Sequence, residues 1–195
     1  MARRLIRLVG PGGAGKSTAG ALLAGRLGVP FVDLDGQFAA AQGDIDEFID
    51  TRGYDEYARA NVELYRAVAR EARGAVFALS SGFMAYPRAV HPRYAVARGA
   101  IARSPTTFVL LPSLDLETCV AEIVRRQLAR PIRRRSAARE ERVIRERFGL
   151  YLALPAPKIA TMRPPADVAA EIAARLSRGE AALATAGTAT GWTGR

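Results

Sequence analysis

The feature that most constrains this chain is a glycine-rich segment close to its start, Gly10-Pro11-Gly12-Gly13-Ala14-Gly15-Lys16-Ser17-Thr18. The segment matches the pattern G-x-x-x-x-G-K-[ST] at every fixed position. An apolar run at 5–9 precedes it and predicts a buried strand, and a helical pattern at 17–27 follows it and ends at Gly28. Glycines let backbone N–H groups turn inward, and a helix N-terminus attracts anions. The segment therefore predicts a phosphate-binding loop between a strand and a helix.

The side chains at the end of this loop indicate which ligand it would take. The Lys16 ammonium would reach the β- and γ-phosphates of a nucleotide, and the Ser17 hydroxyl would coordinate Mg²⁺. A glycine-rich turn with a chance Lys-Ser is the alternative, and the strand–loop–helix setting argues against it. We therefore expect ATP and Mg²⁺ as cofactors. The expected nucleotide contacts in the loop are Gly12, Gly13, Ala14, Gly15, Lys16, Ser17 and Thr18.

The composition is typical of a single globular domain. The chain has 195 residues, 49% of them hydrophobic, and a mean hydropathy of 0.00. No apolar run approaches the length that spans a bilayer, and residues 1–4 lead into a strand, so we expect a cytoplasmic protein without a signal peptide. The single Cys119 excludes an intrachain disulfide and a cysteine-based metal site. It lies in a helical pattern, where we expect it to be a small core residue.

The net charge of +10 narrows the possible partners. A basic surface suits nucleic acid, and it also suits an anionic small molecule. The sequence lacks a basic run interleaved with aromatic residues, which is the pattern that binds single-stranded nucleic acid. We therefore expect a small-molecule substrate, no nucleic acid and no membrane, and a monomer. A nucleotide or nucleic-acid kinase is the alternative that the charge suggests.

Strand and helix patterns alternate along the chain and predict an α/β fold. A five-stranded parallel sheet with helices on both faces follows from this order. We expect one domain over 1–178, with a lid at about 130–140, and a flexible C-terminal tail at 179–195. The expected strands are 5–9, 31–34, 75–79, 107–111 and 158–162, and the expected helices are 17–27, 45–51, 54–73, 93–103, 114–129, 138–150 and 166–178.

Polar residues follow three of these strands and are expected to share one crevice. They are the phosphate loop, Asp33 and Asp35 after the second strand, and Ser80-Ser81-Gly82 after the third. Ligands of parallel sheets bind beyond the carboxyl ends of the strands. Asp33 and Asp35 are two apart on one predicted strand, so their side chains would point the same way. One could face Mg²⁺, and the other could face the hydroxyl group that accepts a phosphoryl group from ATP. An Asp-rich turn is the alternative.

An arginine-rich stretch at 125–147 could close over the nucleotide. Arg130 is the candidate lid cation, because the proline after it fixes where the helix ends. We expect Arg139 and the three arginines at 133–135 to be a solvated charge run. His91, the only histidine, lies between two prolines in a predicted surface segment, and we assign it no catalytic role.

These motifs resemble those of the shikimate kinase family, within the nucleoside-monophosphate-kinase-like group of P-loop kinases. The resemblance runs over about residues 5–176. Asp33-Leu34-Asp35 is similar to the family's D-x-D, which implies that Asp33 lies near Mg²⁺ and that Asp35 holds the attacking substrate hydroxyl. Arg126 falls near the family's adenine-stacking arginine. Arg130-Pro131-Ile132 is similar to the lid motif R-P-L, and Arg147-Phe148-Gly149-Leu150-Tyr151 to R-x-P-L-Y, whose arginine binds the substrate carboxylate.

The resemblance implies an ATP-dependent kinase of aromatic amino acid biosynthesis that phosphorylates a hydroxyl of shikimate or a related hydroxy-carboxylate. The catalytic residues would be Lys16, Asp35 and Arg130, and the metal ligands Ser17 and Asp33. The substrate would contact Asp35, Ser81, Gly82 and Arg147.

The acceptor half of the pattern departs from the family in two places. The family's G-G-G turn is Ser80-Ser81-Gly82 here. A second carboxylate-binding arginine in the family's G-x-x-x-F-R is replaced by Ala58, and Arg59 beside it would point about 100° away on a helix. A ligand-sensing domain without efficient turnover is therefore a second hypothesis.

Overall fold

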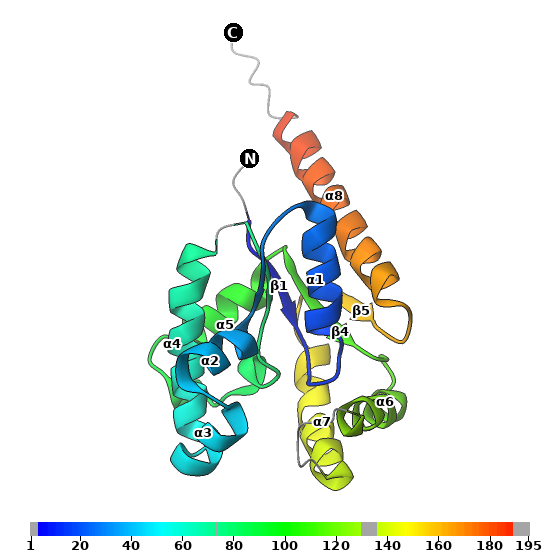
Figure 1. Cartoon of the computed structure of the whole chain (residues 1–195). Coiled ribbons are helices and arrows are strands. Elements are labelled where there is room, and N and C mark those ends of the chain that lie inside the picture. The colour runs from blue at the N-terminus through cyan, green and yellow to red at the C-terminus, as the bar shows by residue number, and fades with distance from the viewer. Residues whose placement is uncertain (1–3, 73, 130–135, 189–195) are drawn as a thin grey trace.

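Five parallel strands form one sheet at the centre of the molecule (Figure 1). The computed structural model describes residues 4–72, 74–129 and 136–188, with the backbone alone at 180–188. The strand order is β2-β3-β1-β4-β5. The strands are β1 (Ile6–Val9), β2 (Phe31–Asp33), β3 (Val76–Ala78), β4 (Thr107–Leu111) and β5 (Lys158–Ala160). The five predicted strands are all present, and the α/β prediction is confirmed.

The middle strands β3, β1 and β4 are largely apolar because both faces of the sheet are covered. Every residue of β3 and β4 is buried, as expected for a parallel sheet between two helical layers. Side chains alternate between the faces. Leu8 packs in the core cluster beneath α1 (Lys16–Leu27) and α8 (Pro165–Thr188), whereas Val9 packs in the cluster on the opposite face.

The helices form two layers that fit the predicted three-layer arrangement (Figure 1). α1 and α8 lie side by side on one face. The other face and the site end carry α4 (Tyr54–Glu71), α5 (Tyr94–Arg103), α6 (Leu116–Leu128) and α7 (Ala137–Leu152). Cys119 on α6 is fully buried, which confirms its core role. In the part of the chain that the structure describes, no helix is long and apolar enough to cross a membrane.

Two helices follow β2, and the first was not predicted. α2 (Leu34–Gln42) starts where we expected the strand to end, with Phe38 buried in the core. α3 (Ile45–Arg52) agrees with the helix predicted at 45–51, and its N-cap Asp44 accepts with Oδ1 from the N–H groups of Asp46 and Glu47 at 2.9 and 3.0 Å. Short 3₁₀ turns, η1 (Phe83–Ala85) and η2 (Arg88–Val90), complete the elements.

Two local predictions require correction. The last helix was expected to end at Arg178, but α8 continues to Thr188, in keeping with the high helix propensity of its alanines. His91 was expected on the surface, but it is buried, with Nε2 2.5 Å from Glu63 Oε1 on α4. Its Nδ1 accepts from the backbone N–H of Arg93 at 3.1 Å. Both ring nitrogens of His91 therefore have hydrogen-bond partners although the side chain is buried, and the flanking prolines did not predict its exposure correctly.

Candidate functional site

The phosphate loop bends sharply between β1 and the N-terminus of α1. Gly13 and Gly15 have φ of 77° and 89°, in the left-handed region that favours glycine. Lys16 is buried, and its Nζ donates to the carbonyl oxygens of Gly10 and Pro11 at 2.8 and 2.9 Å. The ammonium is thereby folded back over the loop, where positive charge and the α1 N-terminus face the same ligand space.

Asp33 joins this loop to the start of α2. Its Oδ2 accepts a hydrogen bond from the Ser17 hydroxyl, and its Oδ1 accepts from the N–H groups of Asp35 and Gly36 at 3.0 and 3.4 Å. Asp33 is thus the N-cap of α2, and Asp35 lies in the first helical turn. The prediction that the two carboxylates share one strand face is wrong, because an Asp in an N-cap starts a helix where the strand would continue.

The Ser17–Asp33 pair has the ligand chemistry that Mg²⁺ prefers. Both groups are oxygen donors, and Mg²⁺ is commonly bound by one or two carboxylates together with nucleotide phosphates. Within residues 4–72, 74–129 and 136–188, no cluster of three or more His, Cys, Asp or Glu side chains could hold a metal by itself. The residues present therefore fit a cation that is shared with a nucleotide.

Arg126 on α6 reaches the outer side of the loop. Its Nη1 donates to the Gly13 carbonyl oxygen at 3.1 Å, and its Nη2 to the Thr161 carbonyl oxygen at 2.9 Å. A cavity of about 290 Å³ opens here, between the loop, α1 and the segment after β5. Thr161 and Arg163 were missed by the sequence prediction because they belong to no motif. The cavity is lined by Gly13, Gly15, Thr18, Ala19, Arg126, Thr161, Arg163, Pro165 and Val168.

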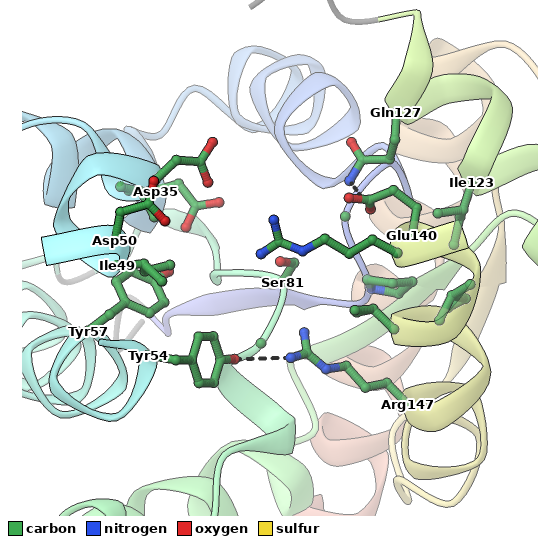
Figure 2. A pocket seen from close by; sticks show the side chains of 18 of the residues that line it. Asp35, Ile49, Asp50, Tyr54, Tyr57, Ser81, Ile123, Gln127, Glu140 and Arg147 are labelled. Carbon is green, nitrogen blue, oxygen red and sulfur yellow. Dashed lines mark hydrogen bonds between the residues drawn. The ribbon is translucent and has the colours of Figure 1, made fainter. Parts of the chain in front are cut away.

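A larger cavity of about 450 Å³ lies on the inner side of the loop (Figure 2). Pro11 and Gly12 border it, and Asp35, Ser81, Gly82 and Arg147 are among the residues that line it. The predicted common crevice therefore holds part of the loop, Asp35, Ser81 and Gly82, whereas Asp33 and Ser80 do not line this cavity. Figure 2 shows Asp35 and Asp50 on one side of this cavity and Gln127 and Glu140 on the other.

The two serines after β3 have different surroundings. Ser81 lines the cavity, whereas Ser80 is buried and its Oγ accepts from Asn61 Nδ2 at 3.0 Å. Tyr151, also buried, donates to the Ser81 carbonyl oxygen at 2.5 Å. The turn is thus fixed by core contacts, and Ser81 alone of the pair offers a hydroxyl to the cavity.

Arg147 on α7 contacts a tyrosine that the sequence prediction missed. Arg147 Nη2 donates to Tyr54 Oη at 3.0 Å across the cavity (Figure 2). Gly82 lies against both groups, since a Cβ atom added to Gly82 would lie 2.5 Å from Tyr54 Oη and 3.4 Å from Arg147 Nη1. The only sequence signal for Tyr54 was its position directly after Gly53, at the start of the predicted helix.

The position at which the family pattern predicts a second arginine is occupied by the uncharged Ala58. Ala58 lies on α4 and is fully buried in the core. The Arg59 side chain is 59% exposed, and its Nη1 lies 3.9 Å from Glu56 Oε2 on the outer face of the helix. Neither residue lines the cavity. Among the described residues, the arginines that line this cavity are Arg147, which is half-buried, and Arg139, which is exposed.

Three further residues from the α6–α7 region complete the cavity wall. Gln127 Nε2 donates to Glu140 Oε2 at 3.2 Å, and both side chains are buried (Figure 2). Arg139 was expected in a solvated charge run, and it is exposed but also lines the cavity. Arg130, the predicted lid cation, and residues 131–135 lie outside the described residues.

Burial and charge also affect the phenols of the site. Desolvation raises the pKa of Tyr57, and the nearby Asp35 carboxylate raises it further. Tyr57 lines the cavity beside Tyr54, with ring centroids 5.9 Å apart. Tyr57 is therefore a neutral hydroxyl over the whole physiological pH range.

Comparison with known proteins agrees with this arrangement. A family model described as shikimate kinase matches residues 12–177. A shikimate kinase of Rhodopseudomonas palustris is 31% identical over 151 residues, which cover 76% of this chain and 68% of that protein. A shikimate kinase of Histophilus somni is 35% identical over 106 residues, and the match spans 54% of this chain but only 59% of that protein. The structure of shikimate kinase from Acinetobacter baumannii in complex with shikimate has a TM-score of 0.69 at 23% identity, covers 90% of this chain and 94% of its own, and supports the fold.

Proposed function

The chain belongs to the shikimate kinase family, and from that premise we propose that it is an ATP-dependent kinase acting on a hydroxyl of shikimate or a related hydroxy-carboxylate. One observation carries the proposal. The phosphate loop separates two cavities, of about 290 and 450 Å³, and the larger one brings Asp35 and Arg147 together beside Gly12. A nucleotide in the smaller cavity would direct its terminal phosphate toward an acceptor in the larger one.

The smaller cavity suits the nucleotide. The Lys16 ammonium would exchange its bonds to the Gly10 and Pro11 carbonyl oxygens for oxygens of the β- and γ-phosphates. The N–H groups of the loop and of the first turn of α1 would hold the remaining phosphate charge. Arg126, fixed against the loop, would contact the adenine.

Ser17 and Asp33 would hold Mg²⁺ at the phosphate end. Mg²⁺, when bound, neutralises charge that develops on the β- and γ-phosphate oxygens. Asp33 is held by the N–H groups of α2, so its second oxygen stays directed at Ser17 without a change of backbone.

The larger cavity suits the acceptor and the chemical step. Asp35 would accept the hydrogen bond of the acceptor hydroxyl and take its proton as the oxygen attacks the γ-phosphorus. A bond between that oxygen and phosphorus forms while the bond to the bridging oxygen of ADP breaks. Arg147 would bind the acceptor carboxylate, with Ser81 and Gly82 forming the floor. Arg130 remains a predicted lid cation.

Shikimate-dependent release of ADP by the purified protein with Mg²⁺-ATP tests the proposal. Asp35→Asn is expected to lower kcat by at least 100-fold and to leave ATP affinity unchanged, because the general base is lost and the nucleotide contacts are kept. Asp50→Asn is the matched control, since Asp50 lines the same cavity from α3 and should retain kcat within a few fold. Full activity of Asp35→Asn would overturn the role of Asp35.

A ligand-sensing domain without efficient turnover is the second candidate. The observation that favours it is the absence of a guanidinium at Ala58, together with the outward position of Arg59. Tight binding of a hydroxy-carboxylate without ADP formation would support this candidate.

A further inference from the structure

The acceptor cavity lacks the second arginine that its family pattern predicts at the position of Ala58. Ala58 lies in the core, and the exposed Arg59 is paired on the outer face of α4. A carboxylate bound at this end of the cavity would contact Arg147 and the group that lies next to Arg147. The group beside it is the hydroxyl of Tyr54.

Tyr54 is held in place from three sides. Its oxygen accepts from Arg147 Nη2 at 3.0 Å. Its ring contacts those of Tyr57 and Tyr86, with centroids 5.9 and 6.0 Å apart. The absence of a side chain at Gly82 leaves the space that the phenol and the guanidinium occupy together. The position of the hydroxyl is thus set by packing as well as by one hydrogen bond.

This hydroxyl retains a proton that can be donated to a ligand. In its bond with Arg147 the oxygen is the acceptor, and among the described residues no hydrogen bond uses Tyr54 as donor. A phenol that accepts from a guanidinium becomes a stronger donor, because hydrogen bonds in a chain polarise one another. The Tyr54 side chain is partly open to the cavity, with 38% of the residue exposed. Arg147 has further N–H donors in its planar fork.

We propose that Tyr54 is a specificity-determining residue and that its hydroxyl and the Arg147 guanidinium together bind the acceptor carboxylate, the phenol replacing the second guanidinium. The inference deepens the proposed function and rests on it. One carboxylate oxygen accepts from the Tyr54 O–H group and the other from an Arg147 N–H group.

The charge of the cavity then limits the acceptor to one negative group. The Tyr54–Arg147 pair supplies one positive charge and one neutral donor. The rest of the wall adds the guanidinium of Arg139. It also adds five carboxylates, which outnumber the two guanidinium groups and repel a second anion: Asp35, Asp44, Asp46, Asp50 and Glu140. The acceptor class is therefore a hydroxylated monocarboxylate, and dicarboxylates and phosphate esters are disfavoured.

Calorimetric titration of the full chain with bound ADP and Mg²⁺ tests the pair directly. The probes are shikimate, quinate and gluconate, each compared with its carboxamide, which keeps the shape and lacks the charge. Tyr54→Phe is expected to weaken carboxylate binding about tenfold and to leave carboxamide binding within twofold, because one hydrogen bond to a charged group is lost. The ATP KM should not change, and kcat at saturating acceptor should stay within a few fold.

Two further variants separate this role from a general effect on folding. Tyr65→Phe is the matched control, since Tyr65 lies on the same helix and its hydroxyl accepts from Arg7 Nε at 3.1 Å, away from the cavity. It removes the same kind of bond and should leave acceptor binding unchanged. Gly82→Ala should reproduce the loss seen in Tyr54→Phe, because the added methyl group displaces the hydroxyl from Arg147.

Three results would overturn the inference: unchanged carboxylate affinity in Tyr54→Phe, an equal loss for carboxylate and carboxamide, or no binding of any of the three carboxylates to the wild-type protein. The proposed kinase activity fails separately. Carboxylate binding that depends on Tyr54 but yields no ADP would uphold the role of Tyr54 and refute phosphoryl transfer. ADP formation with uncharged polyols alone would show phosphoryl transfer and refute the role of Tyr54.

Discussion

Arg126 is held at the phosphate loop by a carboxylate on its own helix. Its Nε donates to Glu122 Oε1 at 2.6 Å, while its Nη1 donates to the Gly13 carbonyl oxygen. Glu122 also accepts two bonds from Arg125, and the bonds from Arg125 and Arg126 lower the pKa of Glu122 to about 2. Glu122 is therefore a positioning residue for the nucleotide side of the site.

The low pKa of Glu122 predicts a pH-dependent contribution to stability. The folded state keeps this carboxylate charged below the ordinary value of 4.5, so stability from Glu122 is present above about pH 4.5 and is lost as the pH falls toward about 2. Glu122→Gln should cost about 1 kcal/mol at pH 7. In urea unfolding at pH 6, 5, 4 and 3, the gap between wild type and this variant should narrow with falling pH. Glu146→Gln on α7 is the control, and a gap independent of pH would contradict the role of Glu122.

At the scale of elements, α2 and α3 are positioned by acidic N-caps that also face the site. Asp33 caps α2 with one oxygen and accepts from Ser17 with the other. Asp44 caps α3 and lines the larger cavity. Because the caps fix where the helices begin, they also fix where Asp35 and Asp50 lie. Local capping thus shapes the wall of the larger cavity.

Removing the cap of α3 should cost stability. Asp44→Ala is expected to lower the free energy of unfolding by about 1 kcal/mol, because the N–H groups of Asp46 and Glu47 lose their acceptor. Asp44→Asn keeps an oxygen acceptor and should recover most of the loss. Urea unfolding monitored by circular dichroism measures both. Equal losses in the two variants would mean that the charge of Asp44 matters and its capping does not.

At the scale of the whole molecule, one loop separates two cavities that open at the same end of the sheet. Gly12 borders the larger cavity and Gly13 the smaller. The loop is fixed to both neighbours, through α1 on one face and Arg126 of α6 on the other. A nucleotide bound at the loop would therefore contact several elements at once and should stabilise the entire fold.

A non-hydrolysable ATP analogue with Mg²⁺ should raise the Tm of the protein. At a ligand concentration 100 times Kd the gain is about 2.7 kcal/mol, or roughly 5–10 °C for a chain of this size. Lys16→Met should abolish most of this shift, because the buried ammonium is lost from the loop. Lys158→Met, at the other lysine of the sequence, should keep the shift. Thermal scans with and without the analogue decide this, and a full shift in Lys16→Met would argue against the loop as the nucleotide site.

Much of the fold could be predicted from the sequence because the signals are local. The strands β3 and β4 are short, fully buried runs of mostly apolar residues, because both faces of a parallel sheet exclude water, and hydrophobicity alone marks them. The phosphate loop is a contiguous motif whose glycines adopt the φ values that the turn needs. The cap at Asp44 is likewise a short-range pattern.

The wrong predictions concern residues whose local sequence fits two structures, so that contacts with distant residues decide between them. Asp33 could end a strand or begin a helix, and only packing of Phe38 against the core favours α2. His91 has a polar side chain between prolines, and its burial depends on Glu63, which is distant in the sequence. Predictions from the propensities of neighbouring residues do not include such long-range contacts.

The sequence by itself therefore determined the sheet, the nucleotide loop and the family pattern, since each depends on neighbouring residues or on spacing along the chain. Only the tertiary structure decided how the acceptor end is built. Tyr54 and Arg147 are 93 positions apart, and Gly82 beneath them comes from a third element. Their meeting depends on the packing of α4 and α7 around the turn after β3, because a hydrogen bond between distant residues forms only when the core has placed both helices.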